Sequence, residues 1–124
     1  GPGTTTENVL DYVDEARGEL NMSYHFDISN LGHKDLAKKL MNPNGWDFLE
    51  FKRIFKRWDE VFRERGWGTV YLGNHDFPRM VSRWGNDTPE FREISSKMLT
   101  TFLLTMRGTP ATFAGTAFIN TELG

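Results

Sequence analysis

Residues 70–87 read VYLGNHDFPRMVSRWGND, in which a short run of strand formers leads directly into a polar loop. The strand formers occupy residues 69–72, and the loop predicted after them extends over residues 73–87. In parallel α/β proteins, the loops that follow the carboxyl ends of strands form the active face. His75 and Asp76 would place an imidazole beside a carboxylate in such a loop. The stretch therefore predicts a functional loop, with a turn carboxylate and an ordinary polar histidine as the alternative.

Helix and strand patterns alternate along the rest of the chain. Capping residues predict three helices, over about residues 6–15 (Thr4 with Glu7), 47–66 (Asp47 with Gly66) and 88–107 (Thr88 with Pro89, stopped at Gly108). Period-two or strand-forming runs predict strands at residues 20–26, 69–72 and 111–114. The polar residues 27–46 are predicted to form a long loop that holds one short helix at about residues 34–41.

Two of the predicted helices carry an apolar stripe at helical spacing. The stripes are Phe48, Phe51, Phe55, Trp58 and Phe62 in one helix, and Phe91, Ile94, Met98, Phe102 and Met106 in the other. We interpret such stripes as core-facing surfaces rather than as platforms on which a ligand stacks.

The order of these elements is helix, strand, helix, strand, helix, strand, which indicates right-handed crossovers and a parallel sheet. About three parallel strands with their helices leave two open strand edges and an uncovered sheet face. We therefore expect an α/β fold in which residues 1–124 are a single segment, incomplete as an isolated chain. Such a segment belongs in a larger barrel or sheet, or covers its edges by self-association.

The stretch 70–87 resembles the fourth conserved region of glycoside hydrolase family 13, the α-amylase family. The likeness is greatest to the oligo-1,6-glucosidase and α-glucosidase branch. Residues 1–5 are similar to the stretch after the fifth barrel strand, residues 19–26 to the sixth strand, and residues 106–110 to the approach to the eighth. The resemblance implies the C-terminal part of a TIM (β/α)8 barrel, comprising the sixth to eighth strands with their helices.

In this family, one carboxylate attacks the anomeric carbon and a second protonates the leaving oxygen, which gives a retaining mechanism. The resemblance implies that Asp76 is the third carboxylate, which grips the sugar hydroxyls and stabilises the transition state. It implies that His75 is a ligand to the same sugar. Arg79 and Arg83 match loop arginines near the substrate entrance, with surface or ion-paired arginines as the alternative.

The sequence departs from the family pattern at both ends. The resemblance implies that the nucleophile Asp and the acid/base Glu belong to strands upstream of Gly1, so we expect an inactive isolated chain. The Gly-Pro-Gly start fits native sequence from the middle of a longer protein or a scar of tag removal. After Pro110 the family continues with aromatic and acidic residues, whereas residues 111–117 here read ATFAGTA. The linkage cleaved, α-1,4 or α-1,6, stays open, as does transfer to another sugar.

Two metal-based alternatives exist. A strand followed by Gly-Asn-His-Asp also occurs in metal-dependent phosphoesterases, which need further His and Asp motifs that this sequence lacks. His25 and Asp27 end the predicted strand at residues 20–26 and could be a metal pair or a polar strand-end pair without function. We predict no metal ligands and no cofactor from the sequence. Calcium, which is common in relatives by the resemblance, stays open because no ligand set can be read here. A carbohydrate-binding module fits poorly, since such modules are mostly β-sandwiches.

The composition is that of an ordinary globular protein, with 38% hydrophobic and 26% charged residues. A net charge of −2 gives no general attraction to nucleic acid or anionic lipid. No apolar run is long enough to span a membrane, and the absence of cysteine leaves both cytoplasm and periplasm open. The expected partners are an oligosaccharide substrate in the complete enzyme, and either a second copy of the chain or the missing part of the barrel.

Overall fold

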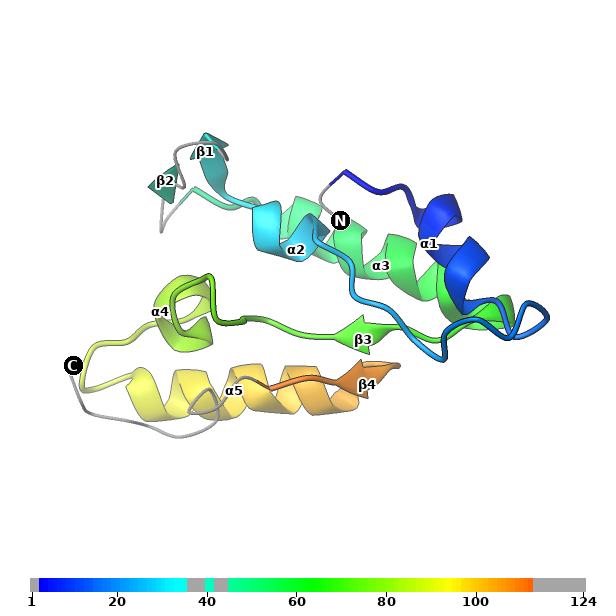
Figure 1. The fold of residues 1–124 in the computed structure, drawn as a ribbon. Coiled ribbons are helices and arrows are strands. Elements are labelled where there is room, and N and C mark those ends of the chain that lie inside the picture. The colour runs from blue at the N-terminus through cyan, green and yellow to red at the C-terminus, as the bar shows by residue number, and fades with distance from the viewer. Residues whose placement is uncertain (1–2, 36–39, 42–44, 113–124) are drawn as a thin grey trace. The chain divides into compact units, whose positions relative to one another are not determined.

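The computed structural model describes residues 3–35, 40–41 and 45–112. The chain forms two compact units. The first unit comprises residues 1–70 with Arg107–Thr109, and the second comprises residues 71–106 with the chain from Pro110 onward. Figure 1 shows the elements that each unit contributes.

The first unit begins with helix α1, Thr6–Val13. Its N-cap is Thr5, whose hydroxyl oxygen accepts a hydrogen bond from the Asn8 amide at 3.2 Å. The prediction of a cap at Thr4 is therefore wrong by one residue, because the hydroxyl that reaches a free amide of the first turn belongs to its neighbour. Val9 and Val13 are buried, and the helix ends two residues before the predicted limit of residue 15.

Helix α3, Phe48–Arg65, confirms the clearest helix of the sequence. A carboxylate oxygen of Asp47 accepts hydrogen bonds from the amides of Leu49 and Glu50, at 2.6 and 3.1 Å, and Gly66 is the C-cap. The predicted stripe is buried from its second member onward, whereas Phe48 is 61% exposed. The buried residues of the helix are Phe51, Ile54, Phe55, Trp58 and Phe62. Helix α1 packs against α3, so these two helices hold much of the core of the first unit.

The predicted strand at residues 20–26 is reduced to one parallel bridge, between Ser23 and Gly68. The Thr69 amide donates to the Ser23 carbonyl oxygen at 3.1 Å. A strand is held by its neighbours, and within the described residues this segment has a bridge partner on one side only. Helix α2, Asp27–Asn30, follows at once and was not predicted.

The predicted short helix at about residues 34–41 is wrong where the structure describes it. Strands β1, His33–Asp35, and β2, Leu40–Met41, pair there as an antiparallel ladder. The sequence of this segment is rich in helix formers, but intrinsic propensity is a weak preference that pairing overrides.

Strands β3, Thr69–Val70, and β4, Thr109–Pro110, form a second two-stranded sheet. The Thr109 amide donates to the Gly68 carbonyl oxygen at 3.0 Å. The last strand thus lies two residues before the predicted range of 111–114, because pairing begins directly after the turn at Gly108. Residues 113 and 114 lie outside the described part of the chain.

The second unit contains helix α4, Met80–Trp84, within the segment predicted as a loop, and helix α5, Arg92–Thr105. The Thr88 carbonyl oxygen accepts from the amides of Phe91 and Arg92, so a turn begins at the predicted cap and the helix begins later. The buried residues of α5 are Ser96, Leu99 and Leu103.

The predicted stripe of α5 is not its buried face, since Ile94 is 66% and Met98 56% exposed, while Phe102 and Met106 are only half-buried. This correction has a packing cause. Apolar residues lie on more than one face of α5, and the face with Leu99 is the one that packs against α4. A Cβ atom at Gly85, the C-cap of α4, would lie 3.3 Å from a Leu99 methyl carbon, which shows how closely the two elements approach.

Candidate functional site

The loop that follows β3 is built around an Asx turn. The Asn74 side-chain oxygen accepts a hydrogen bond from the Asp76 amide at 2.9 Å, and the Phe77 amide points to the Asn74 carbonyl oxygen at 3.5 Å. This local bonding reverses the chain at residues 75–76 and directs two consecutive side chains outward. A short polar side chain at position 74 is therefore the local cause of the turn.

The turn brings His75 and Asp76 together in the open. The His75 Nε2 atom lies 3.6 Å from an Asp76 carboxylate oxygen, and the two side chains are 75% and 51% exposed. Both groups are thus accessible to a ligand, and the pair can combine a negative charge with a hydrogen-bonding imidazole. These are the groups that a site for a hydroxyl-rich, transiently positive substrate requires.

A cavity of about 300 Å³ lies beside this turn. Its lining residues are Gly73, Asn74, His75, Phe77, Pro78, Arg79 and Met80. Two of the four predicted site residues, His75 and Arg79, therefore share one cavity, while Asp76 and Arg83 are not among the described residues that line it. Arg79 is exposed and directly precedes α4, which leaves its guanidinium accessible to a ligand.

Arg83 occupies a different environment, because it is 4% exposed and lies within α4. Its guanidinium carbon lies 4.8 Å from the ring centroid of Phe77 and 4.3 Å from that of Trp84. Burial lowers the pKa of Arg83 to about 10, while the nearby Tyr71 hydroxyl opposes this shift, so the group stays charged at neutral pH. The interpretation of Arg83 as a surface arginine is wrong, and its substrate contact stays a prediction.

Trp84 is a residue of this region that sequence reasoning missed. Its indole Nε1 donates to the Leu72 carbonyl oxygen at 2.6 Å, and both residues are buried. The available signal was a large aromatic residue in a segment otherwise predicted as a polar loop, since tryptophan is seldom placed there without a packing partner.

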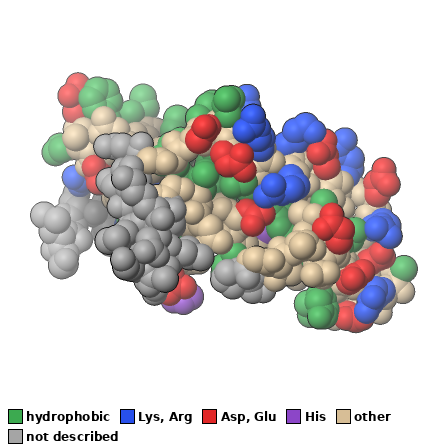
Figure 2. All heavy atoms as spheres, turned by 90° about the horizontal axis from the view of Figure 1, so that it is seen from above, with side chains coloured by type: hydrophobic (Ala, Val, Ile, Leu, Met, Phe, Trp, Pro, Cys, Tyr) green, Lys and Arg blue, Asp and Glu red, His purple; other side chains and the backbone are tan. Residues whose placement is uncertain are grey.

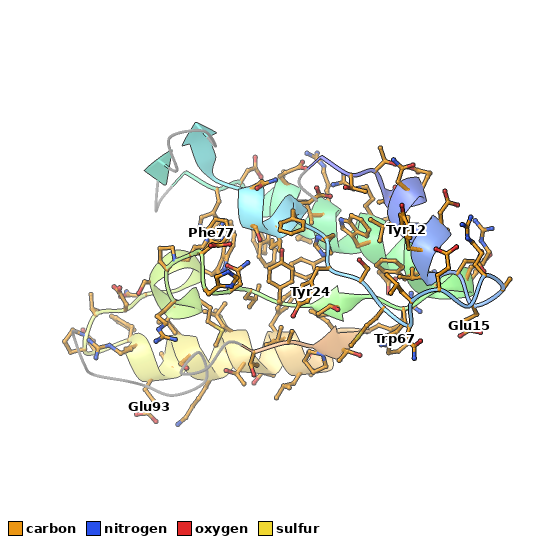
Figure 3. The ribbon with its side chains drawn as sticks, in the orientation of Figure 1. Tyr12, Glu15, Tyr24, Trp67, Phe77 and Glu93 are labelled. Atoms are coloured by element: carbon orange, nitrogen blue, oxygen red, sulfur yellow. The ribbon has the colours of Figure 1, made fainter. Side chains whose placement is uncertain are left out.

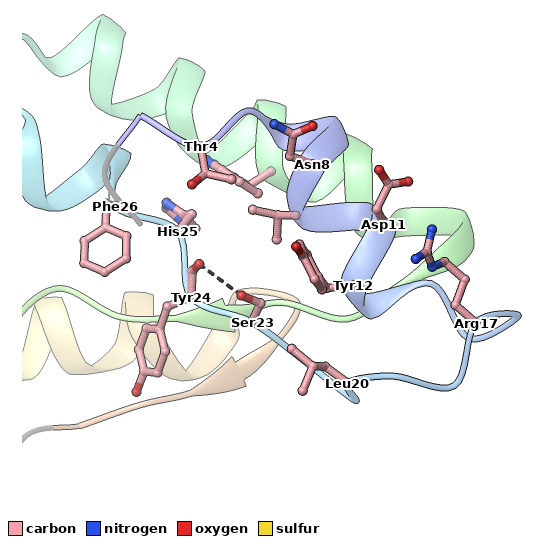
Figure 4. Close-up of a pocket in the computed structure, with 12 residues that line it drawn as sticks. Thr4, Asn8, Asp11, Tyr12, Arg17, Leu20, Ser23, Tyr24, His25 and Phe26 are labelled. Atoms are coloured by element: carbon pink, nitrogen blue, oxygen red, sulfur yellow. Dashed lines mark hydrogen bonds between the residues drawn. The ribbon is translucent and has the colours of Figure 1, made fainter.

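Another cavity, of about 750 Å³, lies in the first unit, between α1 and the segment before α2 (Figure 4). Tyr12, Tyr24 and His25 contribute to its wall. His25 is 4% exposed and stacks on Trp58, and burial lowers its pKa to about 4 against the opposing charge of Asp27. A neutral, buried imidazole of this kind is a core residue.

Asp27 is likewise engaged in the core of the first unit. One of its carboxylate oxygens accepts hydrogen bonds from Arg57 and from the Trp58 indole, both at 2.8 Å. Across the residues that the structure describes, no group of three or more His, Cys, Asp or Glu side chains could hold a metal ion. His25 and Asp27 are thus both engaged with Trp58 in the first unit.

The surface seen in Figure 2 carries Lys and Arg side chains interspersed with Asp and Glu. Along α3, charged side chains form ion pairs, including Arg63 with Asp59 at 2.7 Å. In the described part of the chain, no helix has the length and apolar character that crossing a membrane requires.

Parallel pairing, alternating helices and an exposed carboxylate–imidazole turn after a strand are the features of an α/β barrel enzyme. The chain matches the family described as "Alpha amylase, catalytic domain" over residues 2–122, and it belongs to that family. The family fold is a TIM barrel in the complete enzyme, and this membership favours the glycosidase interpretation of the Gly-Asn-His-Asp motif.

Similar proteins of known identity carry several different names within this family. The chain is 39% identical to the oligo-1,6-glucosidase of Parageobacillus thermoglucosidasius over 114 residues, which cover 92% of this chain and 20% of that protein. Its structure is similar to isomaltulose synthase from Protaminobacter rubrum, with a TM-score of 0.83, 34% identity, and coverage of 92% and 20%. It is also similar to the trehalose-6-phosphate hydrolase of Bacillus licheniformis, with a TM-score of 0.81, 32% identity, and coverage of 91% and 20%. The chain thus spans about one fifth of the length of these relatives.

Proposed function

We propose that this chain is part of the catalytic (β/α)8 barrel of a retaining α-glucosidase that acts on α-glucosidic bonds of oligosaccharides. Within it, residues 1–124 form one segment that supplies the sixth to eighth strands with their helices. The observation that carries the proposal is the exposed pair of His75 and Asp76, 3.6 Å apart in the turn after β3, in a chain of this family.

The proposed role of Asp76 follows from charge. As the glycosidic bond breaks, the anomeric carbon becomes positive, and a fixed carboxylate nearby stabilises that state more than the neutral ground state. His75 would bind a hydroxyl of the same sugar. Arg79, which lines the cavity beside the turn, is the proposed entrance contact. Substrate contact by Arg83 requires that its buried guanidinium become accessible.

The isolated chain should hydrolyse nothing at a useful rate. A retaining reaction needs a nucleophilic carboxylate and an acid/base carboxylate. By the family resemblance, neither lies within residues 1–124. Asp76 can stabilise the transition state, but without the other two carboxylates the chain can neither attack the anomeric carbon nor protonate the leaving oxygen.

A hybrid enzyme tests the proposal. In it, the matched residues of this chain replace the corresponding stretch of the oligo-1,6-glucosidase of P. thermoglucosidasius, to which they are 39% identical. Release of the aryl group from an aryl α-glucoside is then followed for the hybrid and for the 124-residue chain. We expect turnover by the hybrid and none by the chain alone. Turnover by the chain alone, abolished by Asp76→Asn, would show that the two missing carboxylates are not required.

A second candidate function is a non-catalytic, self-associating barrel segment, and exposed apolar side chains favour it. In the first unit Leu20, Met22 and Tyr24 are 51%, 45% and 51% exposed. In the second unit Ile94 and Leu104 are 66% and 61% exposed. Such residues are normally covered, either by the rest of a barrel or by another copy. Light scattering at micromolar concentration should show a dimer or larger assembly, and a clean monomer would count against this candidate.

A further inference from the structure

Helix α4 holds the Asp76 turn from both sides. Trp84 donates its indole N–H to the carbonyl oxygen of Leu72, which lies directly before the turn. Arg83 stacks its guanidinium on the ring of Phe77, which lies directly after Asp76. Figure 3 shows Phe77 on the segment that leads into α4. Two neighbouring residues of one short helix therefore contact the two residues that flank segment 73–76.

Burial makes these contacts restraining. Leu72 is 2%, Arg83 4% and Trp84 6% exposed, so the hydrogen bond and the stacked guanidinium are shielded from water. Between the two contacts, Gly73 and Asn74 are half-buried, and the side chains of His75 and Asp76 at the tip are both more than half exposed. The turn thus has fixed ends and an accessible tip, which is the arrangement that a preorganised catalytic loop requires.

We infer that Arg83 and Trp84 are positioning residues, which hold the Asp76 turn through Phe77 and Leu72 rather than by contacting substrate. The catalytic consequence rests on the function proposed above for Asp76. The mechanical part does not, because it depends only on contacts within the second unit.

The two positioning contacts have different chemical requirements. The contact with Phe77 needs a cation over the ring, so Arg83→Lys keeps the charge but loses the planar guanidinium, and Arg83→Met keeps only the apolar stem. The contact of Trp84 needs an N–H donor, so Trp84→Phe keeps a ring and removes one hydrogen bond. Arg63→Lys and Trp67→Phe are matched controls in the first unit, where Arg63 pairs with Asp59 and Trp67 donates to Thr109.

Hydrogen exchange of the 124-residue chain tests the mechanical part directly. We expect Arg83→Met and Trp84→Phe to lower the protection of the amides at residues 74–77 by about tenfold, the scale of one lost buried hydrogen bond. The two controls should leave these amides unchanged. Unchanged exchange at residues 74–77 in both α4 variants would overturn the inference.

Kinetics of the hybrid enzyme separate positioning from substrate binding. A positioning role predicts a fall in kcat of about 10- to 100-fold for Arg83→Met with little change in KM, because a misplaced catalytic group slows the chemical step. The double variant Arg83→Met with Phe77→Leu should lower kcat about as much as the more damaging single change does. The effects should not add, because each change removes the same contact, that between Arg83 and Phe77. A raised KM with normal kcat would instead make Arg83 a substrate contact and overturn the positioning role.

The Asp76→Asn variant distinguishes the possible failures. If Asp76→Asn is fully active while the α4 variants loosen the turn, the proposed function fails and the positioning contacts stand. If Asp76→Asn is inactive while the α4 variants alter neither exchange nor kcat, the inference fails and the proposed function stands.

Discussion

The imidazole of His25 lies nearly flat on the indole of Trp58, with ring centroids 4.5 Å apart and planes inclined by 12°. Asp27 joins the same cluster by accepting hydrogen bonds from the Trp58 indole and from Arg57. The cluster connects the segment before α2 with the middle of α3. A residue that the sequence offers as a metal ligand is therefore a neutral packing element of the first unit.

This environment predicts that acid weakens the first unit through His25. Its pKa falls from 6.5 to about 4 on folding, mainly through burial, with Asp27 opposing and Arg57 adding to the shift. The unfolded chain therefore binds the proton more readily, so stability is lost as the pH falls from about 6.5 to about 4 and is flat below that. The loss is on the order of 3 kcal/mol at most, and the urea midpoint at several pH values measures it.

Two variants control the acid prediction. His25→Phe keeps the ring stacked on Trp58 and removes the titrating group, so its urea midpoint should change less over this pH range. His75→Asn removes an exposed histidine, and its urea midpoint should fall at acid pH as much as that of the parent chain. If His25→Phe loses as much stability at acid pH as the parent chain does, groups other than His25 are responsible.

Gly108 permits the close approach of β4 to β3. Its φ of +135° is a conformation that favours glycine, and a Cβ atom there would lie 2.8 Å from the Gly68 carbonyl oxygen. Because that oxygen is backbone and has little freedom to move, Gly108→Ala should cost about 3 kcal/mol or more. Gly18→Ala is the control, since Gly18 also has a positive φ, +65°, but a Cβ atom there would have no contact within 4 Å among the described residues beyond its chain neighbours. Gly18→Ala should lower the free energy of unfolding by only about 1 kcal/mol in a denaturant titration. If Gly108→Ala and Gly18→Ala lower it equally, the close contact at Gly108 does not matter.

Arg107 connects the turn before β4 to helix α3. Its Nε donates to an Asp59 carboxylate oxygen at 2.8 Å, and a terminal nitrogen donates to the Asp59 carbonyl oxygen at 2.6 Å. Together with Arg63, it lowers the pKa of Asp59. Arg107→Met should destabilise the chain by about 1–2 kcal/mol, since two charge-assisted bonds at a partly exposed site are lost. Lys56→Met removes an exposed pair with Glu60 on the same helix and should change the midpoint little. If Arg107→Met and Lys56→Met lose the same stability, the contacts of Arg107 with Asp59 do not stabilise the chain.

Features determined by neighbouring residues could be predicted from the sequence. The limits of α3 follow from one carboxylate, Asp47, that accepts bonds from amides two and three residues away, and from a glycine at its end. The loop position of His75 and Asp76 follows from the strand formers before them. These signals act over a few residues and need no knowledge of the rest of the fold.

Features that depend on distant partners were missed. The face of α5 that packs is decided by α4, an element hidden in a segment predicted as a loop, and Ile94 and Met98 are exposed as a result. The burial of Arg83 depends in the same way on Phe77 and Trp84. The strand at residues 20–26 is reduced to one bridge because a strand needs a ladder of partners along its length.

The kinetics of Asp76→Asn in the hybrid enzyme test the central claim most directly, with Asp87→Asn, an exposed carboxylate of the same unit, as the matched control. Because Asp76 is proposed to stabilise the transition state, its loss should lower kcat by about 10²- to 10⁴-fold and change KM little, while Asp87→Asn keeps normal rates. A near-normal kcat for Asp76→Asn would contradict the account.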